Sequence, residues 1–396
     1  MKFSELRMRL INESLSPDEM AIVTHYLQTA DKYGRNIFAA EAKKLLSRTE
    51  VNIEPSGIKW DIPFPATSSA KAKFEFIDLF AGIGGMRAAF QSLGGKCVFS
   101  SEWDQKAQET YFENFGEVPF GDITKIESSS VPKHHILVAG FPCQAFSIAG
   151  ARGGFLDTRG TLFFDVARIL AKKKPDAFLL ENVKGLKSHD RGRTLATILN
   201  TLRNDLGYFV PEPEIVNARD FGVPQNRERI FIVGFKRKRD MLAFTYPKPA
   251  DLKVSVADIK EKKVVSVKYY MSNQYLRTLE EHRRRHEEKG NGFGFEIIPD
   301  DGIANAIVVG GMGRERNLLI DNRLKDFRPI THIKGEVNRR GIRRMTPREW
   351  ARLQGFSDKF VIPVSDAQAY KQFGNSVAVP VIAATGKQIL KALSIR

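Results

Sequence analysis

From residue 74 onward the sequence alternates short apolar runs with helical segments, and this alternation constrains the fold more than any other feature. The apolar runs cover residues 74–80, 97–100, 136–139, 177–180 and 230–235. The helical segments between them cover residues 86–93, 105–114, 162–172 and 194–206. Strands that alternate with helices predict an α/β protein with a doubly wound, mostly parallel sheet. Such sheets bind their ligands at the carboxyl ends of the strands.

The segments on either side of this alternation differ from it. Near the N-terminus, Ser16-Pro17-Asp18-Glu19 combines an N-cap serine, a proline at the first helical position and a capping-box glutamate. It predicts a helical N-terminal arm over residues 1–70. Residues 241–350 break into Gly-rich and Arg-rich pieces, which predicts a smaller domain inserted after residues 71–240. The helical pattern within residues 351–396 would return to complete the first domain.

Positive charge is concentrated in the inserted segment. The chain of 396 residues carries 62 lysines and arginines against 46 acidic residues, a formal net charge of +16. Residues 236–350 hold 26 of the basic and 16 of the acidic residues, whereas residues 1–70 hold nine of each. A basic block of this kind is typical of a nucleic-acid-binding surface, and a solvated lysine-rich face is the alternative.

Composition excludes several other classes of protein. No apolar stretch approaches the roughly 18–20 residues of a membrane span, and the first residues lack the apolar run of a signal peptide. We therefore expect a soluble cytoplasmic protein that contacts no membrane. Two cysteines, Cys97 and Cys143, are too few for a disulfide framework or a Cys-rich zinc site. We expect no metal, and any cysteine chemistry would be that of a lone thiol.

A glycine-rich turn, Ala81-Gly82-Ile83-Gly84-Gly85, ends the first apolar run. The dinucleotide fingerprint G-x-G-x-x-G is not met because its sixth position is Arg87, which favours a nucleotide without a pyrophosphate. About 20 residues on, Glu102-Trp103 offers a carboxylate for ribose hydroxyls and an indole for an adenine face. Asp122-Ile123 could read the adenine amino group. S-adenosylmethionine fits such a site, and a plain strand–turn–helix glycine is the alternative.

Reactive or charged side chains mark three further strand boundaries. Gly140-Phe141-Pro142-Cys143-Gln144 follows the third run, Glu181-Asn182-Val183 follows the fourth, and Gln225-Asn226-Arg227-Glu228-Arg229 precedes the fifth. A thiol at such a boundary becomes a nucleophile if nearby positive charge lowers its pKa. A lone cysteine is otherwise a small buried hydrophobe, which is our interpretation of Cys97. These boundaries place a thiol, a carboxyl group and two guanidiniums at the edge of one sheet. A purely structural role does not easily explain all four together.

These strings resemble the ordered motif set of the cytosine-C5 DNA methyltransferases. The set also includes residues 76–85 and Gln372-Phe373-Gly374-Asn375-Ser376-Val377, and it spans the chain from about residue 74 to the C-terminus. The resemblance implies S-adenosylmethionine as cofactor, double-stranded DNA as partner and a target-recognition domain at residues 241–350. The N-terminal arm lies outside it.

The same resemblance implies specific residue roles. Cys143 would be the nucleophile and Glu181 the acid, while Arg227 and Arg229 would position the base and active-site groups. Arg229 could equally be a structural ion-pair partner. The implied cofactor contacts are Phe80, Gly82, Ile83, Gly85, Glu102, Trp103, Asp122, Ile123, Pro142, Leu162, Asn375 and Val377. The implied DNA contacts are Gln144, Ser147, Arg159, Arg314 and Arg316.

Residues 289–295 and 308–317 are similar to the target region of the CCGG-specific bacterial enzymes of the HpaII type. The guanidiniums of Arg314 and Arg316 suit bidentate contacts with guanine O6 and N7, and phosphate contacts are the alternative. By the same resemblance we expect a monomeric bacterial enzyme of a restriction-modification system. A cognate restriction endonuclease would then act on the same DNA site.

The chemistry of C5 methylation explains why these residue types are needed. Cytosine C5 is a poor nucleophile, and thiolate attack by Cys143 at C6 would place electron density on C5. A carboxyl group at Glu181, hydrogen-bonded at N3, would stabilise the charge that develops on the ring. Because a duplex hides these atoms, the target base must be flipped out.

Three alternative functions stay open at this point. A tRNA cytosine-C5 methyltransferase shares the Pro-Cys-Gln and Glu-Asn-Val strings, but its target region is usually small. A non-catalytic DNA-binding regulatory relative would have lost a catalytic group, yet Cys143 and Glu181 are both present. A nicotinamide-dependent oxidoreductase is disfavoured by the missing third glycine of the fingerprint.

Overall fold

The computed structural model describes residues 1–142 and 162–396, apart from positions 14, 32, 50, 52, 69, 251, 292–293, 311–312, 329–334 and 396. Its centre is a six-stranded sheet in the order β2-β1-β3-β4-β7-β5. The strands are β1 (Phe74–Leu79), β2 (Gly95–Ser101), β3 (Ile136–Gly140), β4 (Ala177–Val183), β5 (Glu214–Asn217) and β7 (Glu228–Phe235). The first four pair in parallel, whereas β7 is antiparallel to both of its neighbours.

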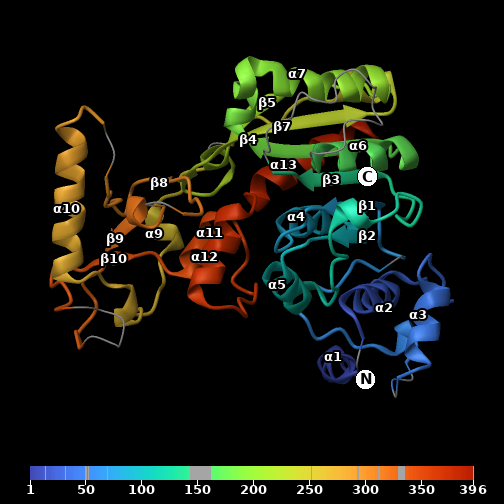
Figure 1. Cartoon of the computed structure of the whole chain (residues 1–396), viewed down its shortest axis with the longest axis horizontal. Coiled ribbons are helices and arrows are strands. Elements are labelled where there is room, and N and C mark those ends of the chain that lie inside the picture. The colour runs from blue at the N-terminus through green and yellow to red at the C-terminus, as the bar shows by residue number, and fades with distance from the viewer. Residues whose placement is uncertain are drawn as a thin grey trace.

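Helices cover both faces of this sheet (Figure 1). One face packs against α4 (Gly85–Ser92), α8 (Lys238–Ala243) and α13 (Val379–Ala392). The other face packs against α6 (Leu162–Lys173) and α7 (Arg193–Asn200). Side chains alternate between the two faces, so that Phe76 and Val138 join the first cluster while Ile77 and Leu137 join the second. The predicted doubly wound α/β class is confirmed.

The direction of β7 is the main difference from a purely parallel sheet. The five predicted apolar runs all form strands, and the four-residue strand β5 was not predicted. Because β7 is antiparallel to β4, it begins at the edge where the parallel strands end, and Arg229 pairs with Val183. The charged residues before and after strands therefore meet at one edge of the sheet.

The N-terminal arm consists of α1 (Phe3–Asn12), α2 (Pro17–Thr29) and α3 (Ala39–Leu46). The predicted capping box of α2 is present, since Glu19 N–H donates to Ser16 Oγ and Ser16 N–H donates to Glu19 Oε2. The arm lies below the sheet in Figure 1, with α2 beside the edge strand β2. Helix α1 was not predicted.

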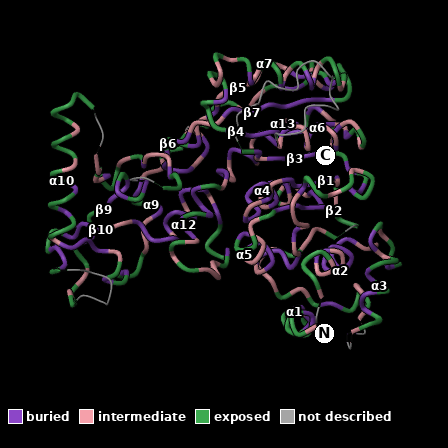
Figure 2. The backbone as a smooth tube through the Cα atoms, viewed as in Figure 1, coloured by how far each residue is buried: buried purple, intermediate pink, exposed green. Residues whose placement is uncertain are grey.

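The inserted segment forms a smaller body at the left of Figure 1. Its elements are α9 (Val256–Ile259), α10 (Asn273–Glu287), β8 (Ala304–Asn305), β9 (Leu318–Ile320) and β10 (Ile342–Arg344). Figure 2 shows α10 as a largely exposed helix. Its buried residues Leu276 and Leu279 belong to one hydrophobic cluster with Leu318 of β9 and Ile342 of β10. Arg343 pairs with Glu349 at 2.7 Å in the buried base of this body.

Three elements connect the inserted segment to the sheet, namely β6 (Gln225–Asn226), α11 (Pro347–Leu353) and α12 (Asp366–Asn375). β6 pairs in parallel with β8, and α13 packs on α4. Short 3-10 or π turns occur at Pro55–Gly57, Ile123–Lys125, Lys184–Lys187, His189–Gly192, Thr201–Asp205, Ala218–Phe221, Val267–Tyr269 and Glu315–Asn317. None of the helices in the described ranges combines the length and the apolar character needed to cross a membrane.

Candidate active site

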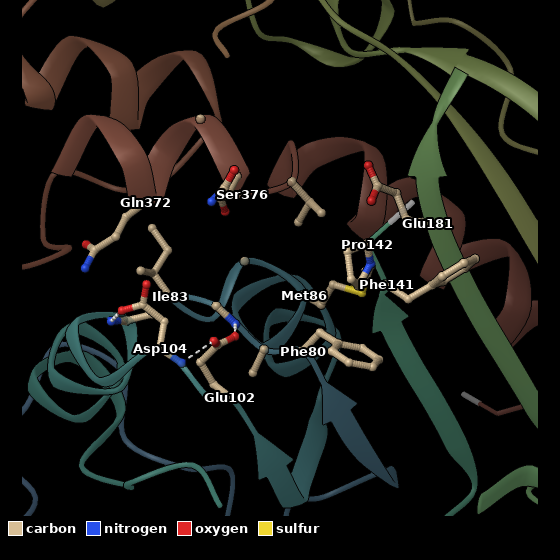
Figure 3. Close-up of a pocket in the computed structure, with 18 of the residues that line it drawn as sticks. Phe80, Ile83, Met86, Glu102, Asp104, Phe141, Pro142, Glu181, Gln372 and Ser376 are labelled. Carbon is tan, nitrogen blue, oxygen red and sulfur yellow. Dashed lines mark hydrogen bonds between the residues drawn. The ribbon is translucent and has the colours of Figure 1, made fainter. Parts of the chain in front are cut away.

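A pocket of about 400 Å³ opens where the parallel strands end, beside the start of β7 and the end of α12 (Figure 3). Ten of the predicted cofactor residues line it, namely Phe80, Gly82, Ile83, Gly85, Glu102, Trp103, Pro142, Leu162, Asn375 and Val377. Glu181, Arg227 and Arg229 line it as well. Asp122 and Ile123 are not among its lining residues. Asp122 instead caps the turn that follows it, where its carboxylate accepts from Thr124 N–H at 3.0 Å.

The glycine turn after β1 is shaped by left-handed backbone and close packing. Gly82 and Gly84 have φ values of 55° and 87°, which glycine adopts at little cost. A Cβ at Gly84 would overlap the ring of Phe115, and one at Gly85 would lie 2.8 Å from Val377. The turn therefore needs its glycines, and it brings α4 close to the returning C-terminal segment.

Glu102, directly after β2, fixes this turn through its buried carboxylate (Figure 3). Oε2 accepts from Gly82 N–H at 2.8 Å and Oε1 accepts from Asp104 N–H at 2.8 Å. Burial raises the pKa of Glu102, and the hydrogen bonds from Asp104 and Gly82 oppose that rise. Because Gly82 N–H already donates to the Glu102 carboxylate, it is not available to bind a phosphate group. This end of the pocket suits an adenosine without phosphates.

An exposed indole and two contacts between α5 and α12 complete the cofactor end of the pocket. The Trp103 side chain is 77% exposed and lines the pocket, where its ring is free to cover a flat ligand. Asp104 caps α5 (Gln105–Phe115) and pairs with Lys371 of α12 at 2.7 Å. Gln372 accepts from Thr110 Oγ1 at 2.9 Å. Helix α12, distant in sequence, is thus fastened to α5 beside the glycine turn.

Glu181 of β4 occupies the other end of the pocket. Its carboxylate is buried, and Oε1 lies 3.2 Å from Arg229 Nε on the neighbouring strand β7. Burial raises the pKa of Glu181, and Arg229 and Arg227 oppose the rise. Gly140 of β3 is its partner in the neighbouring strand, and a Cβ there would make an ordinary van der Waals contact with Glu181 Oε2 at 3.6 Å. The result is a carboxyl group that holds a proton more readily than an exposed one.

Asn182 has a positioning role that the sequence did not single out. Its Nδ2 donates to the Phe141 carbonyl at 2.8 Å and so fixes the backbone just before Pro142. Asn182 and Phe141 lie close together because β3 and β4 are neighbouring strands. The spacing of the two residues along the sequence does not reveal this contact. The predicted residues Cys143, Gln144, Ser147 and Arg159 lie outside the described residues.

Arg227 joins three parts of the chain through hydrogen bonds. Its buried guanidinium donates to the carbonyls of Ile307 at 2.8 Å, Gly374 at 3.2 Å and Ser376 at 2.6 Å. Ile307 belongs to the inserted segment, whereas Gly374 and Ser376 belong to the C-terminal return. Arg227 therefore shapes the pocket by holding its walls.

Arg314 and Arg316 are exposed in the inserted segment, outside the pocket. The Arg314 guanidinium lies 5.5 Å from the centroid of the Tyr370 ring of α12, so it faces the junction between the two bodies. Arg316 is fixed through its backbone, because Asn305 Nδ2 donates to its carbonyl at 3.0 Å. Both side chains remain accessible to a partner.

Comparison with known proteins places the chain in a protein family. Residues 74–391 match the model of the family described as C-5 cytosine-specific DNA methylase. The chain belongs to this family. The methylase match leaves out only the N-terminal arm and the last few residues.

The methylase is similar to curated Type II methyltransferases of bacteria. It is 71% identical over 325 residues to the Type II methyltransferase M.HpaII of Haemophilus parainfluenzae, covering 82% of this chain and 91% of that protein. It is 46% identical over 372 residues to the Type II methyltransferase M.SsoII of Shigella sonnei, covering 92% of this chain and 93% of that protein. The second alignment is too long to fit after residue 73, so it includes part of the arm.

A solved structure supports the fold independently. The methylase superposes on the Dnmt2 methyltransferase of S. pombe with a TM-score of 0.61 and 19% identity, covering 81% of this chain and 99% of that one. The chain is a cytosine-C5 DNA methyltransferase, and enzymes of this family use S-adenosylmethionine.

Proposed function

We propose that the enzyme transfers a methyl group from S-adenosylmethionine to C5 of a cytosine flipped out of duplex DNA. One observation carries this proposal: a single pocket is lined by the Glu102 turn at one end and by Pro142, Glu181 and Arg229 at the other. Figure 3 shows Glu102 and Glu181 at opposite ends of that pocket. A nucleoside cofactor and a target base can therefore meet within it.

At the cofactor end, Glu102 and Trp103 would hold the adenosine. The carboxylate is already oriented by Gly82 and Asp104, and the exposed indole presents a flat face. The bound cofactor supplies an activated methyl group on a sulfonium. The apolar residues Phe80, Ile83 and Leu162 would exclude water from the region between the two ends.

At the base end, Glu181 would donate a hydrogen bond to cytosine N3. A protonated carboxyl group can donate there, and burial raises the pKa of Glu181 in the direction that keeps it protonated. Arg229 holds the carboxyl group in place through the 3.2 Å contact. Cys143 follows Pro142 directly in the sequence, and we propose it as the nucleophile that attacks C6.

The cellular setting follows from the bacterial Type II relatives. We propose that the enzyme works in the bacterial cytoplasm on double-stranded DNA, with a restriction endonuclease that cleaves the same site unmethylated. By the same resemblance to bacterial modification enzymes, we propose that the enzyme is a monomer. The basic segment 236–350 supplies the positive surface that a polyanion requires.

Radiolabelled methyl transfer tests this function directly. Purified enzyme is incubated with methyl-labelled S-adenosylmethionine and either duplex DNA or tRNA. We expect label at C5 of cytosine in DNA, and loss of at least about a thousandfold in rate for Cys143→Ala, because covalent activation of C6 is removed. Cys97→Ala is the matched control, since Cys97 is buried in β2 away from the pocket.

Two outcomes would contradict the proposal. Transfer to tRNA with none to DNA would favour the RNA-methylating alternative. Undiminished transfer by Cys143→Ala would refute the covalent mechanism. A Cys143→Ala protein that still binds duplex DNA while transferring nothing supports both parts of the proposal.

A further inference from the structure

The N-terminal arm sends three buried polar side chains into the domain that carries the pocket. They are Thr24, His25 and Gln28 of α2, and all lie outside the part of the chain that the family model matches. We propose that these are positioning residues that hold Glu102 in its cofactor-binding place. This inference rests on the proposed function, because it takes S-adenosylmethionine to bind beside Glu102.

His25 contacts the edge strand β2 two residues before Glu102. Its Nε2 accepts from Ser100 N–H at 3.2 Å, and its Nδ1 lies 2.8 Å from the Ala21 carbonyl, to which it donates. Ser100 N–H faces away from β1, so it needs an acceptor from outside the sheet. Burial, the largest effect, lowers the pKa of His25 and keeps Nε2 free to accept.

Thr24 and Gln28 hold the chain segment that returns to β2 after α5. Val118 N–H donates to Thr24 Oγ1 at 3.0 Å, and Gln28 Nε2 donates to the Phe115 carbonyl. Both ends of the turn at residues 115–118 are therefore bound to one face of α2. The turn would otherwise have an unpaired donor and an unpaired acceptor at a buried position, which is costly.

The returning segment is in turn bonded to Glu102. Phe120 N–H donates to the Ser100 carbonyl at 2.9 Å, and Glu102 N–H donates to the Phe120 carbonyl at 2.8 Å. The centroid of the Phe120 ring lies 4.6 Å from that of the His25 ring and 4.9 Å from that of the Phe99 ring. Phe120 thus links the arm to the backbone of Glu102 by hydrogen bonds and by ring contacts.

A buried ion pair connects Ser100, the residue that His25 binds, to the glycine turn. Ser100 Oγ donates to Glu117 Oε1 at 2.9 Å, and this oxygen pairs with Arg87 Nη1 at 2.8 Å. Arg87 lies in the first turn of α4, directly after the glycine turn, and its backbone N–H donates to Asp78 at 3.1 Å. The arm therefore supports both structural neighbours of the Glu102 carboxylate, the end of β2 and the start of α4.

Equilibrium binding of S-adenosylmethionine to the full chain tests this inference. We expect His25→Leu to weaken cofactor binding about tenfold, as loss of one buried hydrogen bond predicts, and Thr24→Val to weaken it a few-fold. His25→Gln should restore much of the affinity, because its amide oxygen can accept from Ser100 N–H. Methyl transfer should show a raised KM for the cofactor with kcat unchanged, and DNA affinity should not change.

Leu45→Ala provides the control for a merely structural effect. Leu45 is a buried apolar side chain of α3 that makes none of these hydrogen bonds, so its truncation should lower Tm without changing cofactor affinity. Wild-type cofactor affinity in both His25→Leu and Thr24→Val would overturn the inference. So would an equal loss of affinity in Leu45→Ala at the same loss of Tm.

The same experiment separates this inference from the proposed function. If the wild-type chain binds no S-adenosylmethionine, the proposed function fails and the inference fails with it. If the wild-type chain binds it and Glu102→Ala does not, the cofactor site stands. The arm variants then decide the positioning role alone.

Discussion

At the scale of single residues, Glu181 shows how two opposing influences set one pKa. Burial against β3 and β7 favours the neutral acid, whereas the guanidinium of Arg229 favours the carboxylate. The sequence predicted a carboxyl group at a strand end. It could not predict that Arg229 lies across from it, because that contact depends on the antiparallel direction of β7.

Removal of Arg229 should move the alkaline limb of the pH–rate profile. A carboxyl group whose pKa is raised stays protonated to a higher pH, and activity that needs the acid is lost as pH rises through that pKa. Without the cation that lowers it, the pKa of Glu181 should rise further. We expect Arg229→Gln to shift the alkaline limb of kcat/KM to higher pH, whatever it does to the maximum rate.

Methyl transfer measured between pH 6 and pH 10 checks this expectation. Arg328→Gln is the control, because Arg328 is exposed and pairs with exposed Asp326, away from the pocket. A limb that stays in place, or that moves to lower pH, in Arg229→Gln would show that Glu181 does not act as the acid.

At the scale of elements, periodicity predicted the strands and helices that surround the pocket. The capping box placed the start of α2 at its observed residue, and the five apolar runs became strands. The short strand β5 and helix α1 were not predicted, because neither has a strong local signal in the sequence. The roles of Arg227 and Asn182 depend on contacts across more than 40 residues, which spacing along the chain does not encode.

Replacement of Gly84 tests the fit between the glycine turn and α5. An alanine there would place a Cβ into the Phe115 ring at a backbone φ of 87°. Left-handed strain and overpacking together should lower the free energy of unfolding by about 2–4 kcal/mol. Urea unfolding measures the loss, and Phe115→Leu in the same chain should recover part of it.

Gly57→Ala is the matched control for that change. Gly57 lies in a surface turn where an added Cβ meets nothing within 4 Å. The Gly57→Ala protein should have the same urea midpoint of unfolding as the wild-type protein. Equal destabilisation by the two substitutions would show that Gly84 has no special packing role.

At the scale of the whole molecule, we propose that the inserted body recognises the DNA site. Arg314 is exposed beside the Tyr370 ring of α12, and Arg316 is exposed two residues further along the same segment. The sequence predicted both residues and the basic block that contains them. Their accessibility follows from the fold, because the neighbouring Glu315 and Asn317 are buried.

Protection of plasmid DNA tests the CCGG specificity that the resemblance to the HpaII-type enzymes predicts. Plasmid from cells that express the enzyme should resist an endonuclease that cleaves unmethylated CCGG. Arg314→Ala and Arg316→Ala should each reduce methylation about 10- to 100-fold at these sites, the range for a lost guanine contact. Arg328→Ala should leave protection complete. If every CCGG site stays sensitive to cleavage with the wild-type enzyme, the predicted specificity is wrong.

The pocket also carries a consequence for how the protein is made. One of its walls comes from residues 371–377, whereas its glycine turn lies nearly 300 residues earlier. A ribosome would therefore release the turn, β2 and β4 well before the segment that closes the site. During that interval the sheet face that α13 later covers is open to water or to chaperones. Cofactor binding must then wait until the chain has been translated past α12.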